Sequence, residues 1–132
     1  MFVKDVMNNK IVSIDSNETI ESASKKYRDY KIGCLLVTDR EDVVGIVTER
    51  DFIERTICKG IDPKTTKIKE IMSSVIVTIN SDDTIGDALD TLKKNKIKKL
   101  PVISDDRLVG IITISDIAYS RSNIRKFLEK KN

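Results

Sequence analysis

The sequence has 132 residues, of which 39% are hydrophobic and 34% charged, and its formal net charge is +3. This composition argues against intrinsic disorder and fits one ordinary domain or two very small ones. The absence of histidine excludes imidazole catalysis and histidine-ligated zinc, and two cysteines are too few for an all-cysteine zinc site. No apolar run approaches the roughly 20 residues of a membrane-spanning helix, and the N-terminus lacks a secretory apolar region.

The positive charge is concentrated at the end of the chain. Residues 121–132 contain five basic side chains and one acidic one, a net +4, which leaves −1 on residues 1–120. A protein that coats nucleic acid over its whole surface is therefore not indicated. Basic residues favour helix C-termini, so the tail is interpreted as a solvated helix end.

The two cysteines favour a reducing compartment. Cys34 lies in an apolar run, where a free cysteine behaves as a small hydrophobe, and Cys58 is expected near a helix end with partial exposure. Nothing in the pattern requires a disulfide.

The first half of the chain alternates between strand-like and helix-like segments. The polar cluster Asp15-Ser16-Asn17 can cap a helix, and Asp39–Asp42 is typical of a turn. The strands are expected at Ile11–Ile14, Leu35–Thr38 and Val43–Val47, with one helix through Ile20, Ala23 and Tyr27 and another that begins at Thr48. The predicted order is β-α-β-β-α.

The second half repeats this order at a spacing of 65 residues. Val3–Ile53 aligns with Ile68–Ala118 without a gap, with 18 identities among 51 pairs. The strands are expected at Ile76–Ile79, Leu100–Ile103 and Leu108–Ile112, with helices through Ile85, Ala88, Leu89 and Leu92 and from Thr113 onward, and a turn at Ser104–Arg107.

Units this small bury little surface alone, so two of them are expected to pair about a pseudo-two-fold axis. The predicted class is α/β (α+β), with two β-α-β-β-α units packed through their sheets. The predicted boundaries are 1–58 for the first unit, 59–67 for a linker, 68–120 for the second unit and 121–132 for a basic helical tail.

One seven-residue segment follows the third predicted strand of both repeats. It reads Gly-Ile-Val-Thr-Glu-Arg-Asp at 45–51 and Gly-Ile-Ile-Thr-Ile-Ser-Asp at 110–116. Threonine at a helix start with an acid three residues later is typical of a capping box. The same helix start also favours an anion, and the aspartate can accept two hydrogen bonds from a vicinal diol such as ribose. The two interpretations are compatible, and both stay open.

These features together resemble a pair of CBS domains, also called a Bateman module. The resemblance rests on the tandem units, the Leu-Pro-Val strand at Leu100–Val102 and the paired Gly-x-x-Thr-x-x-Asp segments, and it covers residues 1 to about 120. No catalytic domain flanks the pair, so the chain is similar to stand-alone CBS-pair proteins. The resemblance implies binding of AMP, ADP, ATP or S-adenosylmethionine in clefts between the units, with no metal and no required cofactor.

The resemblance also implies a role for each matching residue. Asp51 and Asp116 correspond to contacts with ribose hydroxyls, Thr48 and Thr113 to contacts with phosphate or ribose oxygens, Ser13-Ile14 and Thr78-Ile79 to contacts with adenine, and Leu35, Leu100 and Pro101 to walls of the base pocket. Leu36 stands where the second repeat has Pro101, so the two adenine pockets are expected to differ.

Cations near these positions favour a phosphorylated ligand. In the family, a basic residue shortly before the second strand often reaches the ligand of the opposite unit, and Lys31 and Lys96 occupy that position. Solvated lysines at a helix end are the simpler interpretation. Arg50 has Ser115 as its counterpart, and Arg121 is a candidate replacement. The two clefts are therefore expected to be unequal.

We thus expect a cytoplasmic, non-enzymatic module that senses adenosine nucleotides, modulates an unidentified partner protein, forms a homodimer and has no membrane contact. One alternative is a nucleic-acid-associated protein that uses residues 121–132 and Lys93–Lys99, although aromatic content is only 5%. Another is a structural dimerisation module with vestigial sites. The lack of glutamine and histidine, with many isoleucines, lysines and glutamates, hints at a thermophilic source.

Overall fold

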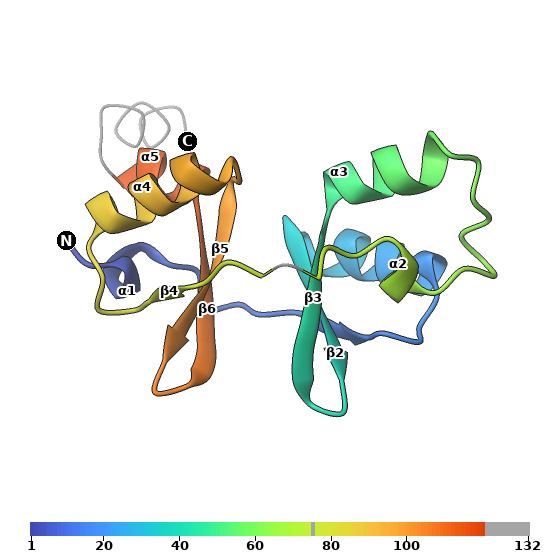
Figure 1. Cartoon of the computed structure of the whole chain (residues 1–132), viewed down its shortest axis with the longest axis horizontal. Coiled ribbons are helices and arrows are strands. Elements are labelled where there is room, and N and C mark those ends of the chain that lie inside the picture. Colours follow the sequence, from blue (N-terminus) through green and yellow to red (C-terminus); the bar gives the residue numbers. More distant parts are fainter. Residues whose placement is uncertain (75, 121–132) are drawn as a thin grey trace. The chain divides into compact units, whose positions relative to one another are not determined.

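The structure, a computed structural model, describes residues 1–74 and 76–120. The chain forms two compact units, each with its own three-stranded sheet (Figure 1). One comprises Val12–Ile76 and is called the β1–β3 unit. The other combines Met1–Ile11 with the chain from Val77 onward and is called the β4–β6 unit. The predicted α+β class, with the order β-α-β-β-α in each half, is confirmed.

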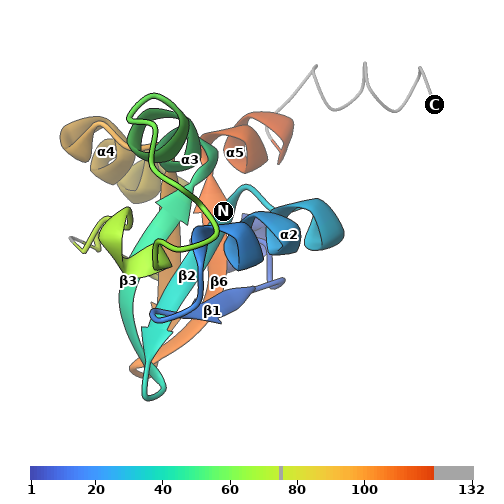
Figure 2. The same ribbon diagram turned by 90° about the vertical axis from the view of Figure 1, so that its right-hand side faces the viewer.

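The β1–β3 unit is built on the sheet order β1-β2-β3. Its elements are β1 (Ser13–Asp15), α2 (Ile20–Tyr30), β2 (Cys34–Asp39), β3 (Asp42–Thr48), α3 (Glu49–Phe52), a π-helical segment η1 (Ile53–Ile57) and a short 3-10 segment η2 (Ile68–Glu70). Strand β1 is parallel to β2, and β2 is antiparallel to β3. The parallel pair requires a crossover, which α2 provides beside β1 (Figure 2).

The β4–β6 unit has the same topology, with the sheet order β4-β5-β6. Its elements are α1 (Val3–Val6), β4 (Ile79–Asn80), α4 (Ile85–Asn95), β5 (Lys99–Ser104), β6 (Arg107–Thr113) and α5 (Ile114–Ser120). The Thr19 and Thr84 side chains cap α2 and α4 by accepting hydrogen bonds from backbone N–H groups. A polar side chain after the first strand thus starts each crossover helix, but the N-caps are Thr19 and Thr84 rather than the predicted cluster Asp15-Ser16-Asn17 and its counterpart at 80–82.

The predicted positions of the two first strands are partly wrong. Strand β1 begins at Ser13 instead of Ile11, and β4 begins at Ile79 instead of Ile76. Ile11 and Ile76 are the last residues before the chain passes from one compact unit into the other. Their β-branched side chains favoured strand, but no partner strand accompanies them across that passage.

Both hairpins turn through two residues with positive φ. Arg40 and Glu41 have φ of 51° and 74°, and Asp105 and Asp106 have φ of 51° and 61°. Two consecutive positive φ values characterise the type I′ turn, whose twist matches that of the flanking strands. The predicted turns at Asp39–Asp42 and Ser104–Arg107 are confirmed.

Each unit has a hydrophobic core of its own. Leu35, Val37 and Val47 are fully buried in the β1–β3 unit, and Leu100, Val102 and Ile112 in the β4–β6 unit. Cys34 is buried and Cys58 exposed, and no disulfide joins them. Among the described helices, none combines the length and the hydropathy that a membrane span needs.

The opening segments of the two repeats are exchanged. In the β4–β6 unit, Val3 donates its N–H to the Asp83 carbonyl at 2.8 Å; at the same register in the β1–β3 unit, Ile68 donates to the Glu18 carbonyl at 2.7 Å. Val3 and Ile68 are both fully buried. The opening segment of each repeat therefore completes the unit formed mainly by the other repeat. The boundaries predicted from the repeat at 58, 67 and 120 follow sequence similarity, and they stay a prediction.

Each exchanged segment also crosses the third strand of its unit at a glycine. Ser73 and Ile46 exchange two backbone hydrogen bonds of 2.9 and 3.0 Å, and Asn8 and Ile111 exchange two of 2.8 and 2.9 Å. The residue before each isoleucine is glycine, over which Met72 or Met7 lies. The glycine of each Gly-x-x-Thr-x-x-Asp segment thus allows two backbones to approach closely.

Candidate functional site

The first candidate site lies where β3 ends and α3 begins. The Thr48 N–H donates to Oδ2 of Asp51 at 2.9 Å, and the Thr48 hydroxyl lies 3.4 Å from the same oxygen. The other carboxylate oxygen, Oδ1, lies 3.6 Å from Nε of Arg55. The Asp51 side chain is only 16% exposed. A half-buried carboxylate is therefore held at the strand-to-helix turn, with one oxygen used by the backbone.

The equivalent turn in the β4–β6 unit closes a reciprocal capping box. The Thr113 N–H donates to Oδ2 of Asp116 at 3.0 Å, and the Asp116 N–H donates to the Thr113 hydroxyl at 3.0 Å. Both residues are partly buried. The capping interpretation of the two motifs is confirmed, and the contact with a ribose diol stays a prediction.

Two arginines, Arg50 and Arg55, lie close to Asp51 in the sequence, and only Arg50 was predicted to contact a ligand. Arg50 forms a surface ion pair with Glu54, at 2.9 Å between Nε and Oε1, and its side chain is 78% exposed. This pair raises the pKa of the Arg50 guanidinium. Arg55 instead faces Asp51 and donates to the carbonyls of Ile71 and Met72 at 3.0 and 3.3 Å. The sequence repeat ends at Ile53 and therefore gave no signal for Arg55.

Lys31 and Lys96 occupy a special backbone position in both units. They are the C-caps of α2 and α4, with left-handed φ of 51° and 54°. Glycine or asparagine is the usual residue there, because a Cβ atom is strained at positive φ. Both lysine side chains are exposed. The same strained lysine thus recurs in both repeats.

The apolar residues expected to wall the base pocket are buried, and their contact with a base stays a prediction. Leu35 and Leu100 have no exposed surface and belong to the two cores, and Pro101 is also buried. The Leu35 and Leu100 side chains pack in the cores of their own units. Pro101 lies inside β5 opposite Ile111 on β6.

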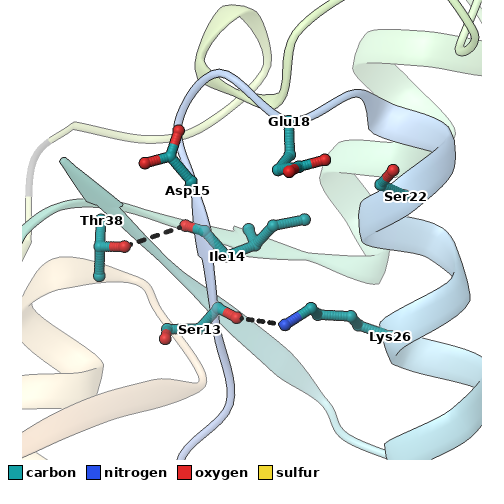
Figure 3. A pocket seen from close by; sticks show the side chains of 7 residues that line it. All are labelled: Ser13, Ile14, Asp15, Glu18, Ser22, Lys26 and Thr38. Carbon is teal, nitrogen blue, oxygen red and sulfur yellow. Dashed lines mark hydrogen bonds between the residues drawn. The ribbon is translucent and has the colours of Figure 1, made fainter.

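A polar pocket of about 380 Å³ lies at the free edge of β1, beside α2 (Figure 3). Its lining combines two predicted site residues with others that the sequence did not single out: Ser13, Ile14, Asp15, Glu18, Ser22, Lys26 and Thr38. Lys26 donates to the Ser13 carbonyl at 2.9 Å and Thr38 to the Ile14 carbonyl at 3.3 Å. Thr78 and Ile79 hold the matching positions at β4, where Thr78 is exposed and Ile79 is buried.

The predicted alternative of a basic nucleic-acid surface falls partly on described residues. Lys93–Lys99 spans the end of α4 and the start of β5, and its lysines are exposed except for the half-buried Lys99. Residues 121–132, including Arg121, lie outside the described part of the chain. Within that part, no three histidine, cysteine, aspartate or glutamate side chains group as metal ligands.

Tyr27 supports the strand-to-helix turn of the β1–β3 unit from inside. Its hydroxyl donates to the carbonyl of Val47, the residue before Thr48, and its ring packs edge-on against Phe52 with centroids 5.0 Å apart. Burial raises the pKa of the Tyr27 phenol, and the acidic groups of Cys34, Glu49 and Asp51 add to the rise. The neutral phenol is therefore the folded form.

Replacing Tyr27 by phenylalanine is expected to change stability differently at neutral and alkaline pH. At pH 7 the variant loses about 1 kcal/mol of unfolding free energy, since the Val47 carbonyl loses its donor. Above pH 10, tyrosine ionises in the unfolded chain but not in the fold, so the wild type loses about 1.4 kcal/mol per pH unit that the variant keeps. Urea unfolding between pH 7 and 11 measures both effects. Tyr30→Phe, at a position with 46% exposure, is the control, and an identical slope in wild type and Tyr27→Phe would contradict the assignment.

Comparison with known proteins supports the architecture. The family model for the CBS domain matches residues 3–57 and 68–123. The CBS domain-containing protein YhcV of Bacillus subtilis is 29% identical over 119 residues, which cover 90% of this chain and 84% of YhcV. The CBS domain pair of protein MJ0100, solved with 5′-methylthioadenosine and S-adenosyl-L-methionine, has a TM-score of 0.79 at 29% identity and 98% coverage of both chains. A hexameric CBS-CP12 protein from bloom-forming cyanobacteria has a TM-score of 0.85 at 30% identity, covering 99% of this chain and 79% of its own.

Proposed function

The chain belongs to the CBS-domain family, and from this premise we propose that it is a ligand-sensing regulatory protein that binds an adenosine compound. AMP, ADP and ATP are the first candidates, and S-adenosylmethionine is the next. The observation that carries the proposal is the paired threonine–aspartate turn, which recurs in both units with the carboxylate half-buried and its Oδ2 oxygen tied to the backbone. The similar MJ0100 pair was solved with two adenosine compounds, which supports this ligand class.

In this proposal each aspartate accepts hydrogen bonds from the ribose hydroxyls. A carboxylate fixed by a backbone N–H is already oriented, so a diol meets it without an additional ordering cost. Thr48 and Thr113 lie beside the carboxylates and offer hydroxyls to ribose or phosphate oxygens. Ser13 and Ile14, which line the pocket at β1, are the proposed adenine contacts of their unit, with Thr78 and Ile79 as counterparts.

Lys31 and Lys96 are the proposed phosphate contacts. A non-glycine residue at positive φ costs folding free energy, and such strain persists where the residue serves another purpose. Both lysines carry this strain at the same repeat position. The simplest explanation for lysine instead of glycine at these positions is a role for the ammonium group.

The proposal includes no catalytic step. YhcV, a CBS domain-containing protein, is matched over 84% of its length. We propose that ligand binding shifts the population of conformations, and that a partner protein recognises the shifted one. A cytoplasmic homodimer is the proposed assembly. A hexameric relative supports self-association in this family.

The lysine assignment predicts opposite effects on stability and binding. Lys31→Gly and Lys96→Gly are each expected to raise the unfolding free energy by about 1 kcal/mol, because glycine relieves the strain at positive φ. Each is expected to weaken AMP binding about tenfold, since a charge-assisted contact is lost. Adenosine, which lacks the phosphate, should bind the variants as it binds the wild type. Isothermal calorimetry and urea unfolding measure the two quantities.

The control for this test is Lys25→Ala. It removes one positive charge from the same helix as Lys31, at a side chain that is 58% exposed and faces Glu21 at 3.8 Å. Its AMP affinity should equal that of the wild type. If both glycine variants gain stability and keep their AMP affinity, the lysines are helix caps and nothing more.

A further inference from the structure

Arg55 makes the surroundings of Asp51 electrostatically unlike those of Asp116. Its Nε lies 3.6 Å from Oδ1 of Asp51, whereas the Thr48 N–H binds the other oxygen, Oδ2. Its terminal nitrogen donates to the Ile71 and Met72 carbonyls at 3.0 and 3.3 Å. The guanidinium is thus fixed from one side by two carbonyls and meets the carboxylate on the other.

Among the described residues of the second repeat, none forms an ion pair with Asp116. At a spacing of 65 residues, Ser120 takes the place of Arg55, and its hydroxyl donates to the Ile117 carbonyl of its own helix at 2.8 Å. Helix α5 stays α-helical through Ser120, whereas the equivalent stretch of the first repeat is the π-helical segment η1. The two units therefore differ in helix type at the repeat position where one has Arg55 and the other has Ser120.

The π-helical segment carries a local cost. The hydroxyl of Thr56, next to Arg55, is buried and has no hydrogen-bond partner among the described residues. Buried polar atoms without a partner are rare because their desolvation is not compensated. π-helical turns are also rare and are often found at functional sites. Both unfavourable features occur at or next to Arg55, the residue that faces Asp51.

We propose that Arg55 is a specificity-determining residue that adapts the site at Asp51 to phosphorylated adenosine ligands. This inference rests on the proposed function. A carboxylate repels a phosphate held nearby, and a guanidinium in contact with the carboxylate offsets that repulsion. At Asp116 the equivalent position holds the uncharged Ser120, so that position offers no such compensation. The site at Asp51 therefore prefers AMP over adenosine more strongly than the site at Asp116 does.

The test compares AMP with adenosine at one site at a time. Asp116→Ala leaves only the site at Asp51, and in this background calorimetry gives the ratio of adenosine Kd to AMP Kd before and after Arg55→Gln. Glutamine keeps a donor for the Ile71 carbonyl and removes the charge. The ratio should fall about tenfold, with adenosine affinity unchanged within twofold. Conversely, Ser120→Arg in the Asp51→Ala background should raise the ratio at Asp116.

Arg55→Lys and Lys64→Ser complete the design. Lysine keeps the charge and should keep most of the wild-type ratio. Lys64→Ser removes a positive charge from an exposed position in the same unit and should leave the ratio unchanged. If Arg55→Gln does not fold, Ser120→Arg still decides the question, because it adds a positive charge at the other site and leaves the first repeat unchanged.

Three results would overturn the inference. An unchanged ratio in Arg55→Gln, in a parent that binds both ligands, removes the specificity role and leaves the proposed function intact. Equal weakening of AMP and adenosine means that Arg55 only supports the fold. Absence of binding by the wild type to every adenosine compound removes the proposed function itself, and with it this inference.

Discussion

Alanine at Gly45 or Gly110 is expected to lower the free energy of unfolding by about 2–3 kcal/mol, because it forces apart two backbones that must touch. A Cβ atom at Gly45 would lie 3.0 Å from the Ser73 carbonyl oxygen, and one at Gly110 would lie 2.9 Å from the Asn8 carbonyl oxygen. Methionine side chains are the other close neighbours and can move aside. The carbonyls are held by the backbone hydrogen bonds of the crossing and cannot.

Gly86→Ala is the matched control for this prediction. Gly86 lies in the first turn of α4, where an added Cβ would meet only the Thr84 hydroxyl, at 3.6 Å. Alanine favours the helix, so this variant should gain about 0.5 kcal/mol. Urea unfolding of the three variants provides the comparison. The prediction is wrong if the free energies of unfolding of Gly45→Ala and Gly110→Ala lie within about 0.5 kcal/mol of the wild-type value. The exchanged segments would then not pack closely against the third strands of their units.

Alanine at Asp51 or Asp116 is expected to weaken the adenosine ligand at that site about 100-fold, equivalent to about 2.7 kcal/mol. Two hydrogen bonds from the ribose diol to a charged acceptor account for a loss of this size. Each variant is also expected to lose about 1 kcal/mol of unfolding free energy, because the backbone N–H of Thr48 or Thr113, three residues earlier, loses its acceptor. Calorimetry on each single variant should show one site lost and the other retained.

The stability loss and the binding loss are separated by Asp87→Ala. Asp87 closes a capping box at the start of α4, with the Thr84 N–H at 3.1 Å from its Oδ2 and its own N–H at 3.1 Å from the Thr84 hydroxyl. Asp87 is exposed and outside the proposed sites. Its alanine variant should lose similar stability and no affinity. An affinity loss in Asp87→Ala equal to that in Asp51→Ala and Asp116→Ala would reduce the two aspartates to helix caps.

The repeat explains why much of the fold could be predicted from the sequence. Two copies with the same apolar periodicity support the same elements, so β2, β3, β5 and β6 and the starts of α3 and α5 lie close to the predicted positions. The exchange of opening segments could not be predicted, since it depends on backbone hydrogen bonds that leave no pattern except Gly45 and Gly110. The same exchange explains why Ile11 and Ile76, which are predicted in strands, lie outside them.

The candidate site could be predicted only where it repeats. Thr48, Asp51, Thr113 and Asp116 stand in equivalent positions, and the structure places both pairs at strand-to-helix turns. Arg55 could not be found in this way, because it has no counterpart and faces Asp51 from the π-helical segment. The strained backbone of Lys31 and Lys96 was likewise hidden, as φ at a helix end depends on how the chain leaves the helix.

The central claim is that this chain binds an adenosine compound, and thermal unfolding in the presence of AMP, ADP, ATP and S-adenosylmethionine tests it most directly. A ligand of the folded state raises the midpoint as its concentration exceeds Kd, with about 2.7 kcal/mol of added stability at 100 times Kd. We predict a saturable rise with at least one of the four compounds, absent in the double variant Asp51→Ala/Asp116→Ala. An unchanged midpoint with all four at millimolar concentration would contradict the proposed function.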